Sequence, residues 1–192
     1  MTDLQLRMRN ELEPILTLHD PRQKISAYHD MPCAIFRYDP EDEFALRNEA
    51  TLLETRLTQA GKRVHRISLA ECLEQAMRAQ HPLKDWFQTE REQGTESLAQ
   101  TVHAVLSDYA PSLVDLVASR MPEHADPHRD IIFILRTGAL FPFYRAHTLL
   151  EQLHGRVSTP TVLFYPGTLD GKVGLKFMGV LDADPNYRPK II

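Results

Sequence analysis

Cysteine is scarce in this sequence. The chain of 192 residues holds two cysteines, Cys33 and Cys72, which are too few for a disulfide scaffold and lack the spacing of metal ligands. Both lie in segments with strand or helix patterns, where a thiol usually behaves as a small apolar side chain. We therefore expect two buried thiols and no need for a disulfide or a metal to hold the fold.

Long apolar runs are missing as well. The longest strongly apolar run extends only from Ile131 to Leu135, whereas a membrane-spanning helix needs about 20 apolar residues. The first residues, Met1 to Arg7, are polar and charged and lack the apolar core of a signal peptide. These features predict a cytoplasmic protein without a membrane contact.

Positive charge is not in excess. The formal net charge is −4; residues 1–96 hold 13 Lys and Arg against 17 Asp and Glu, and residues 97–192 hold 9 of each. Proteins that bind nucleic acids usually carry a basic surface, so direct nucleic-acid binding is not expected. The acidic residues form no long block of like charge, which is typical of a solvated surface.

The sequence also lacks a convincing phosphate-binding loop. No G-x-G-x-x-G motif follows a predicted strand. The segment Gly167–Lys172 resembles a phosphate loop, but three residues separate its glycines, Val173 follows the lysine, and a strand rather than a helix is predicted next. A phosphate loop needs the helix because the N-terminal amides bind the anion. The pair Asp170-Gly171 instead favours a hairpin turn.

Catalytic and metal-binding patterns are equally weak. His124, Asp126 and His128 lie close together, but Pro127 disfavours the helix that would present both imidazoles on one side, and no further ligand has a recognisable spacing. There is no G-x-S-x-G motif, and no pair of carboxylates can be assigned as acid and base. We predict no enzymatic activity and no cofactor.

The chain does contain the pattern of an ordinary globular protein, with 43% hydrophobic and 25% charged residues. Short apolar segments alternate with helical patterns, which predicts an α/β fold with an open, mostly parallel sheet covered by helices, Rossmann-like or degenerate P-loop-like. The predicted strands lie at residues 33–38, 62–67, 130–136, 161–165 and 175–181. We expect one domain, residues 1–192, with a helical insertion at about 82–120, in which 85–94 is a loop or a helical segment.

Several helix ends can be placed from local signals. Leu4, Met8, Leu12 and Ile15 have helical spacing, and Pro14 is expected to end or kink that first helix. Asp39-Pro40 favours a helix start, because Asp caps the first turn and Pro suits its first position. The spacing Ser68-x-x-Glu71 is that of a capping box. Another helix is predicted from about Pro142 to His154.

Polar and aromatic residues gather where the late strands end. Because the ends of parallel strands share one edge of the sheet, these side chains could converge on one surface. Two interpretations remain open: an arginine network that holds loops together, or a surface that binds a partner or a ligand. With the aromatic and basic residues near the C-terminus, the candidate surface comprises Arg136, Tyr144, Arg145, Tyr165, Asp170, Lys172, Tyr187 and Arg188. Tyr144 and Arg145 are expected in the first turn of the helix from Pro142.

The same region carries a family resemblance. The run from Ile131 to Arg145 resembles the block "strand, T/S-G-A-L-F/Y-P-F-x-R" of the BrxB family. The segments Thr159–Gly167, Leu175–Gly179 and Asn186–Arg188 resemble further blocks of that family. This small family is encoded in bacteriophage exclusion (BREX) defence clusters, and its length is about that of this chain.

The resemblance implies a role in a multi-protein antiphage system. Its expected partners are the alkaline-phosphatase-like subunit, the AAA-type ATPase and the methyltransferase of the system. The family offers no established catalytic residue to transfer. Our first hypothesis is therefore a non-catalytic adaptor or scaffold for other BREX subunits, and the alternative is a degenerate nucleotide-binding regulator that uses Gly167–Lys172.

Overall fold

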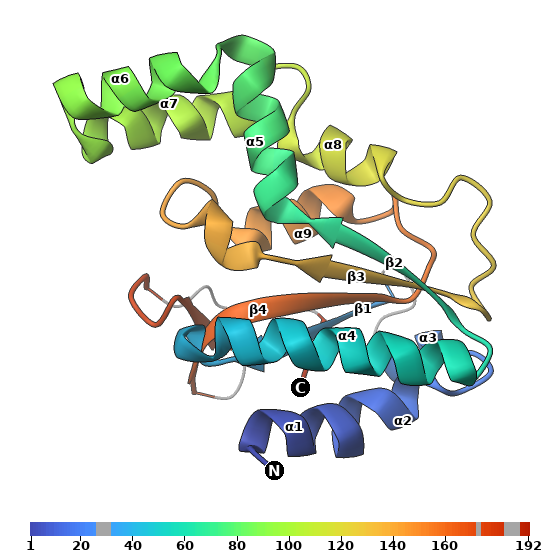
Figure 1. Ribbon diagram of the computed structural model, residues 1–192. Helices are drawn as coiled ribbons and strands as arrows, with labels where there is room; N and C mark the ends of the chain where they lie inside the picture. Colours follow the sequence, from blue (N-terminus) through green and yellow to red (C-terminus); the bar gives the residue numbers. More distant parts are fainter. Residues whose placement is uncertain (26–31, 172–173, 183–188) are drawn as a thin grey trace.

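The core of the molecule is a six-stranded sheet (Figure 1), in a computed structural model that describes residues 1–25, 32–171, 174–182 and 189–192. The strands are β1 (Cys33–Tyr38), β2 (Arg63–Ser68), β3 (Asp130–Leu135), β4 (Thr161–Asp170), β5 (Gly174–Phe177) and β6 (Lys190–Ile191). They are ordered β2-β3-β4-β1-β6, and every neighbouring pair in this order is parallel. β5 pairs antiparallel with the last residues of β4. The predicted α/β fold with a mostly parallel sheet is confirmed.

Helices connect the strands and cover both faces of the sheet. They are α1 (Asp3–Arg7), α2 (Glu13–Leu16), α3 (Arg22–Ile25), α4 (Glu43–Gln59), α5 (Leu69–Gln80), α6 (Leu83–Gln93), α7 (Thr95–Ser107), α8 (Leu113–Ser119) and α9 (Ala146–Leu153). A π-helical turn, η1 (Met8–Leu12), joins α1 to α2, and two 3-10 turns are η2 (Pro40–Asp42) and η3 (Thr137–Leu140). Among the described helices, none combines the length and apolar character needed to cross a membrane.

The sheet divides the core into two apolar clusters. In β3, Ile132 and Ile134 belong to one cluster, whereas Ile131 and Phe133 belong to the other. The N-terminal helices and α4 lie on one side of the sheet, and α5, α8 and α9 lie on the other (Figure 1). Successive side chains of a strand point to opposite faces, so a strand covered on both sides needs a continuous apolar run.

Because the strands are parallel, their C-terminal ends lie along one border of the sheet. The chain passes from β1 through α4 to β2 at the far side of the sheet, and then returns through β3 and β4 by helices on the opposite face. Right-handed crossovers require this change of face when the direction reverses. The parallel strands end together near Tyr38, Leu135 and Pro166, and we call this border the carboxyl edge.

The first helical segment runs past its proline. Pro14 is the second residue of α2 and follows the π-helical turn, in which the amide of Glu13 donates to the carbonyl of Met8. A proline within an α-helix clashes with the carbonyl four residues earlier. The wider π-helical turn lies where Pro14 would produce this clash. The extra residue also shifts the buried face, so that Leu16 is buried rather than Ile15.

The region predicted as an insertion contains three helices. Residues 85–94, for which a loop and a helix were both open, lie almost entirely in α6. α6 and α7 pack side by side and extend away from the sheet, and we call this pair the helical arm (Figure 1). α8 packs against α5 and α9 and therefore belongs to the layer over the sheet.

Several boundaries differ from the sequence prediction; the strand expected at 161–165, for example, continues as β4 to Asp170, where it pairs with β5. The helix expected from Pro142 begins at Ala146, because the preceding residues turn so that Phe141 and Phe143 pack against the core. The last predicted strand, 175–181, ends at Phe177, because Met178 and Gly179 both have positive φ, 54° and 70°, and turn the chain. Asp39 caps the 3-10 turn that leads into α4, by accepting from the Glu41 amide, and Ser68 accepts from the Glu71 amide, which is one half of the expected capping box.

Candidate functional site

Three polar side chains meet at the carboxyl edge. The hydroxyl of Tyr38, at the end of β1, donates to the carboxylate of Glu43, in the first turn of α4. The other oxygen of that carboxylate, Oε1, lies 3.3 Å from Nε of Arg136, which follows β3. Burial, together with the hydrogen bond to Glu43, raises the pKa of Tyr38. Strands β1 and β3 are therefore bridged at their ends by a tyrosine, a carboxylate and a guanidinium.

Arg136 itself adopts an unusual backbone. Its φ of 63° lies in the left-handed region, which costs about 1–2 kcal/mol for a residue with a Cβ atom. The next residue, Thr137, is buried and donates its hydroxyl to the carbonyl of Phe164 at 2.7 Å, which ties the turn to β4. The strained turn directs the chain from β3 into η3 and leaves the Arg136 side chain beside Glu43.

The other described residues of the candidate surface have separate partners. Tyr144 is buried, its hydroxyl donates to Gln152 at 2.9 Å, and burial raises its pKa to about 12. Arg145 is the residue before α9 rather than part of its first turn, and it donates to the carbonyl of Asp182 at 3.2 Å.

Tyr165, in β4, is buried, and its ring centroid lies 5.3 Å from that of Phe177. Asp170 lies 3.9 Å from the ammonium of Lys176 in the neighbouring strand. Lys172, Tyr187 and Arg188 lie outside the described residues.

The structure adds Tyr38 and Glu43 to the residues singled out in the sequence. Asp39 and the acidic residues after it carry the signal of a helix start, and Glu43 continues that acidic run. Nothing local in the sequence pairs Glu43 with Arg136, because their proximity depends on the order of β1, β4 and β3 in the sheet.

The turn between β1 and α4 is strongly acidic. Asp39, Glu41 and Asp42 are exposed there, and Glu43 follows them. The first strand–helix turn is where doubly wound sheets hold phosphates, by means of glycines and free amides at a helix N-terminus. Here no glycine is present, and four carboxylates in five residues repel an anion.

The segment Gly167–Lys172 does not precede a helix. Gly167 to Asp170 form the end of β4 and pair with β5, and Gly171, with φ of 66°, begins the turn. A Cβ atom on Gly167 would lie 2.2 Å from the carbonyl oxygen of Lys176, so the close approach of the two strands requires glycine. The predicted hairpin is confirmed.

A second polar cluster lies at the opposite edge, where the parallel strands begin. The buried carboxylate of Asp130 accepts from Arg63 at 2.7 Å and from the backbone amide of Asp126 at 2.7 Å, and it lies 2.9 Å from Nε2 of His65. Burial would raise the pKa of Asp130, but these hydrogen bonds outweigh it and lower the pKa.

The histidines of the segment 121–129 are separated. His124 lines a hollow of about 530 Å³ between this segment and residues 156–159. His128 instead packs against His19, with ring centroids 4.5 Å apart and the rings tilted by 36°. Within the described part of the chain, no three His, Cys, Asp or Glu side chains are grouped in a way that could hold a metal ion.

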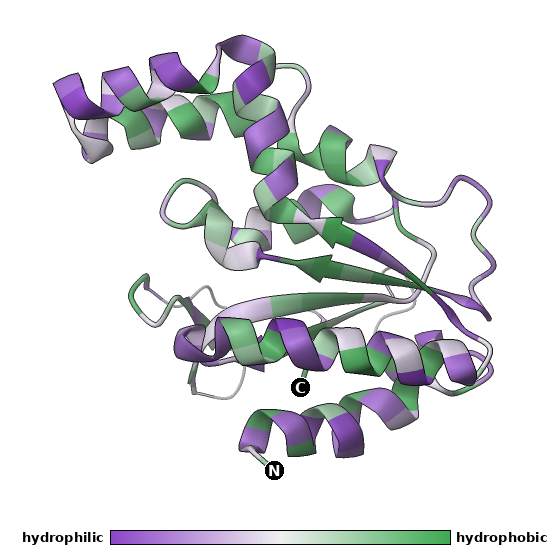
Figure 2. Cartoon of the chain, viewed as in Figure 1, coloured by the Kyte–Doolittle hydropathy of each residue, from purple (hydrophilic) through white to green (hydrophobic). Residues whose placement is uncertain are grey.

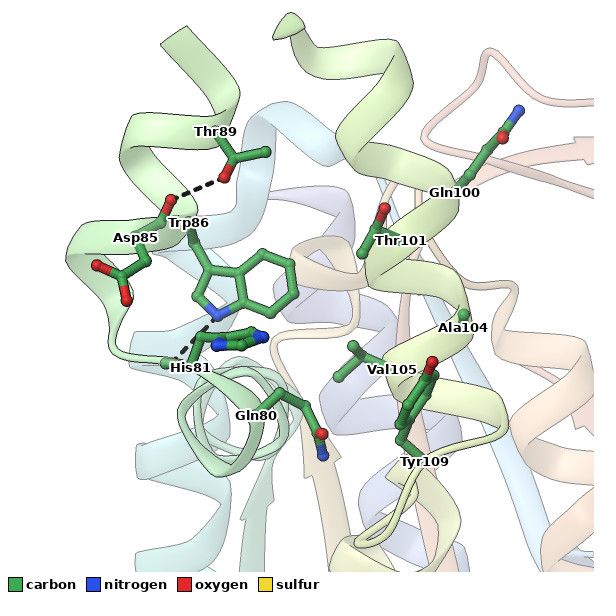
Figure 3. A pocket seen from close by; sticks show the side chains of 10 residues that line it. All are labelled: Gln80, His81, Asp85, Trp86, Thr89, Gln100, Thr101, Ala104, Val105 and Tyr109. Atoms are coloured by element: carbon green, nitrogen blue, oxygen red, sulfur yellow. Dashed lines mark hydrogen bonds between the residues drawn. The ribbon is translucent and has the colours of Figure 1, made fainter. Parts of the chain in front are cut away.

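A third feature is a groove on the helical arm. It is lined by residues of α6 and α7 and by the chain before and after them, among them His81, Trp86, Val105 and Tyr109 (Figure 3). The indole N–H of Trp86 donates to the carbonyls of Met77 and His81, at 3.1 and 3.2 Å. These bonds anchor α6 to the end of α5.

The fold and these surfaces define an α/β protein with a parallel sheet, a carboxyl edge bridged by its own side chains and a projecting helical arm. The family model described as "BREX protein BrxB" matches residues 65–192. A curated relative, the BREX protein BrxB of Bacillus cereus (strain H3081.97), is 28% identical over 181 residues, which cover 93% of this chain and 92% of the relative. No solved structure gives a significant match.

The chain belongs to the BrxB family. It is therefore a component of a BREX defence system, which confirms the resemblance that its motif blocks indicate. The region matched by the family model contains the helical arm and all the residues of the candidate surface, whereas Tyr38 and Glu43 precede it.

Proposed function

We propose that this protein is a non-catalytic adaptor that holds other subunits of its BREX system together in the cytoplasm. The observation that carries the proposal is the bridge at the carboxyl edge, where Arg136 meets Glu43 and Glu43 accepts from Tyr38. This edge is where α/β proteins of this class usually hold a substrate. Here its central polar groups are engaged with one another.

Charge supports the same proposal and disfavours the nucleotide-binding alternative. The acidic turn Asp39–Glu43 lies where a phosphate would be held, and Gly167–Asp170 leads into β5 rather than a helix. The first segment has a helix N-terminus, but its carboxylates repel an anion, and the second segment has no helix N-terminus whose amides could bind one. An adaptor needs no such site, only surfaces that its partners recognise.

The direct test is recovery of partners. The tagged protein is expressed in cells that carry the complete defence cluster and is isolated at low salt, and the same tagged protein in cells without the other genes of the cluster serves as the control. We expect the alkaline-phosphatase-like subunit, the AAA-type ATPase or the methyltransferase to co-purify in a fixed ratio. Recovery of no other cluster protein contradicts the adaptor role.

A second measurement separates the adaptor from the regulator. A ligand present at 100 times its Kd stabilises a protein by about 2.7 kcal/mol, which thermal melting detects readily. We expect no change in melting temperature with ATP or GTP, with or without magnesium. A stabilisation of that size by either nucleotide favours the regulator instead.

A further inference from the structure

The groove on the helical arm is large enough to admit a side chain of another protein. It has a volume of about 540 Å³, within the range of about 300–1,000 Å³ that is usual for binding pockets. Trp86 and Val105 face each other across it, and Tyr109 lies at its side (Figure 3). Trp86 and Val105 are 5% and 3% exposed, whereas Tyr109 is 52% exposed. The groove therefore has an apolar floor and an accessible aromatic wall.

The floor offers little hydrogen bonding of its own. The one N–H of the Trp86 ring is already donated to two backbone carbonyls. The neighbouring floor residues, Ala104 and Val105, have aliphatic side chains. An aliphatic chain can therefore cover this floor without leaving a buried polar group unpaired.

The surroundings of the groove are acidic. Residues 83–108 contain 2 Lys and Arg against 5 Asp and Glu. Of the described residues that line the groove, Asp85 carries the one negative charge and no Lys or Arg is present. The residues of α6 are mostly hydrophilic (Figure 2). A cation at the rim would find the face of Tyr109 in a negatively charged surrounding, to which Asp85 contributes from the other side of Trp86 (Figure 3).

We infer that the groove binds an arginine side chain from a basic segment of a partner protein. The methylene stem of arginine packs on Trp86 and Val105, and its guanidinium lies at the rim against Tyr109, while Asp85, beyond Trp86, adds negative charge without touching it (Figure 3). Arginine combines an apolar stem with a planar cation that stacks on aromatic rings. This inference rests on the proposed adaptor function, because it names the kind of partner surface that the arm recognises.

The single tryptophan of the chain makes the groove directly observable. Because Trp86 is the one tryptophan, intrinsic tryptophan fluorescence of the intact protein reports on this site alone. The probes are blocked pentapeptides of alternating alanine and arginine, with matched peptides in which arginine is replaced by citrulline or by norleucine. Citrulline keeps the shape of arginine without its charge, and norleucine keeps the apolar stem alone.

The arginine peptide is expected to change the Trp86 emission and to bind about tenfold more tightly than the citrulline peptide, since cation–π pairs contribute about 0.5–2 kcal/mol. Its affinity should fall as salt is raised. Equal binding of the norleucine peptide overturns the inference, as does the absence of any response up to millimolar arginine peptide. Light scattering that shows a dimer broken by Tyr109→Ala also overturns it, because a second copy would then occupy the groove.

Matched variants locate the interaction. Tyr109→Ala should weaken the arginine peptide about fivefold, and Asp85→Asn should weaken it less than Tyr109→Ala, because Asp85 acts at a distance and is screened by salt. Phe87→Ala is the control, because Phe87 is next to Trp86 and 55% exposed but does not line the groove. Far-UV circular dichroism checks that each variant is folded. An equal loss with Phe87→Ala contradicts a site in the groove.

The two proposals fail in different ways. If the arginine peptide does not bind, but wild type and Tyr109→Ala still recover cluster proteins, arginine binding by the groove is contradicted. The adaptor function then stands. Arginine-selective binding with no cluster protein recovered contradicts the adaptor and leaves the groove as an isolated peptide site.

Discussion

The most informative perturbation is Asp130→Asn, at the edge where the parallel strands begin. The carboxylate of Asp130 is 2% exposed and accepts hydrogen bonds from Arg63 and from the amide of Asp126, with His65 also within 2.9 Å. Asparagine has nearly the same shape but has a single acceptor oxygen and a donor group. One carboxylate oxygen is then replaced by an NH2 group, so the negative charge is lost and a single oxygen remains to accept from Arg63 and from the Asp126 amide.

The expected loss follows from these contacts. A hydrogen bond to a charged group is worth about 1.5–3 kcal/mol, and leaving a buried partner unsatisfied costs about 1–3 kcal/mol. Arg63 is more than half exposed, so its share is reduced by screening. We therefore expect Asp130→Asn to lower the free energy of unfolding by about 3 kcal/mol and, at roughly 2–4 °C for each kcal/mol, the melting temperature by about 9 °C.

Urea unfolding at several pH values tests the assignment. Because the folded pKa of Asp130 is lowered below its ordinary value of 3.8, its contribution is fully present above that value and is lost as the pH falls through the folded pKa. The difference between wild type and Asp130→Asn should be constant near neutral pH and shrink in acid. Asp108→Asn, at the exposed end of α7, is the control, with a change within about 0.5 kcal/mol. If Asp130→Asn changes the free energy of unfolding by no more than about 0.5 kcal/mol, or by an amount that does not depend on pH, the reasoning is refuted.

Two further predictions concern the β4–β5 hairpin and the thiols. Gly167→Ala should destabilise the protein by about 1–3 kcal/mol in urea unfolding, because its Cβ would lie 2.2 Å from the Lys176 carbonyl oxygen; Gly138→Ala, with its nearest contact at 3.5 Å, is the control. Equal stability of the two variants contradicts the close approach. Burial raises the pKa of Cys33 to about 12 and of Cys72 to about 11, so iodoacetamide near neutral pH should label both fully in denaturant and hardly at all in the folded protein, as followed by mass spectrometry. Rapid labelling of the native protein would show that this burial is wrong.

Much of the fold was predictable because its signals are local. The continuous apolar run of β3 predicts a strand buried on both faces, and the two clusters on either side of it confirm this. Asp39 and Ser68 mark helix starts through contacts that span two or three residues. The hairpin after Gly167 was also predictable, since Asp170-Gly171 is a turn signal.

Boundaries that depend on packing were predicted less well. Nothing near Pro142 indicates that Phe141 and Phe143 are drawn to the core and delay α9 to Ala146. The shift of the buried face from Ile15 to Leu16 depends on a π-helical turn, which periodicity at the α-helical spacing does not reveal.

The candidate surface shows the same division. Its residue types and the family to which they point could be read along the chain, because motif blocks are contiguous. The bridge from Tyr38 through Glu43 to Arg136 could not be predicted from the sequence. It joins the ends of two strands that a third strand separates, and strand order cannot be read from a single sequence. The groove of the arm likewise exists only where α6 and α7 pack together. Composition and periodicity depend on neighbours along the chain and thus determine the class of fold, whereas sites form between distant segments and are decided by the tertiary structure.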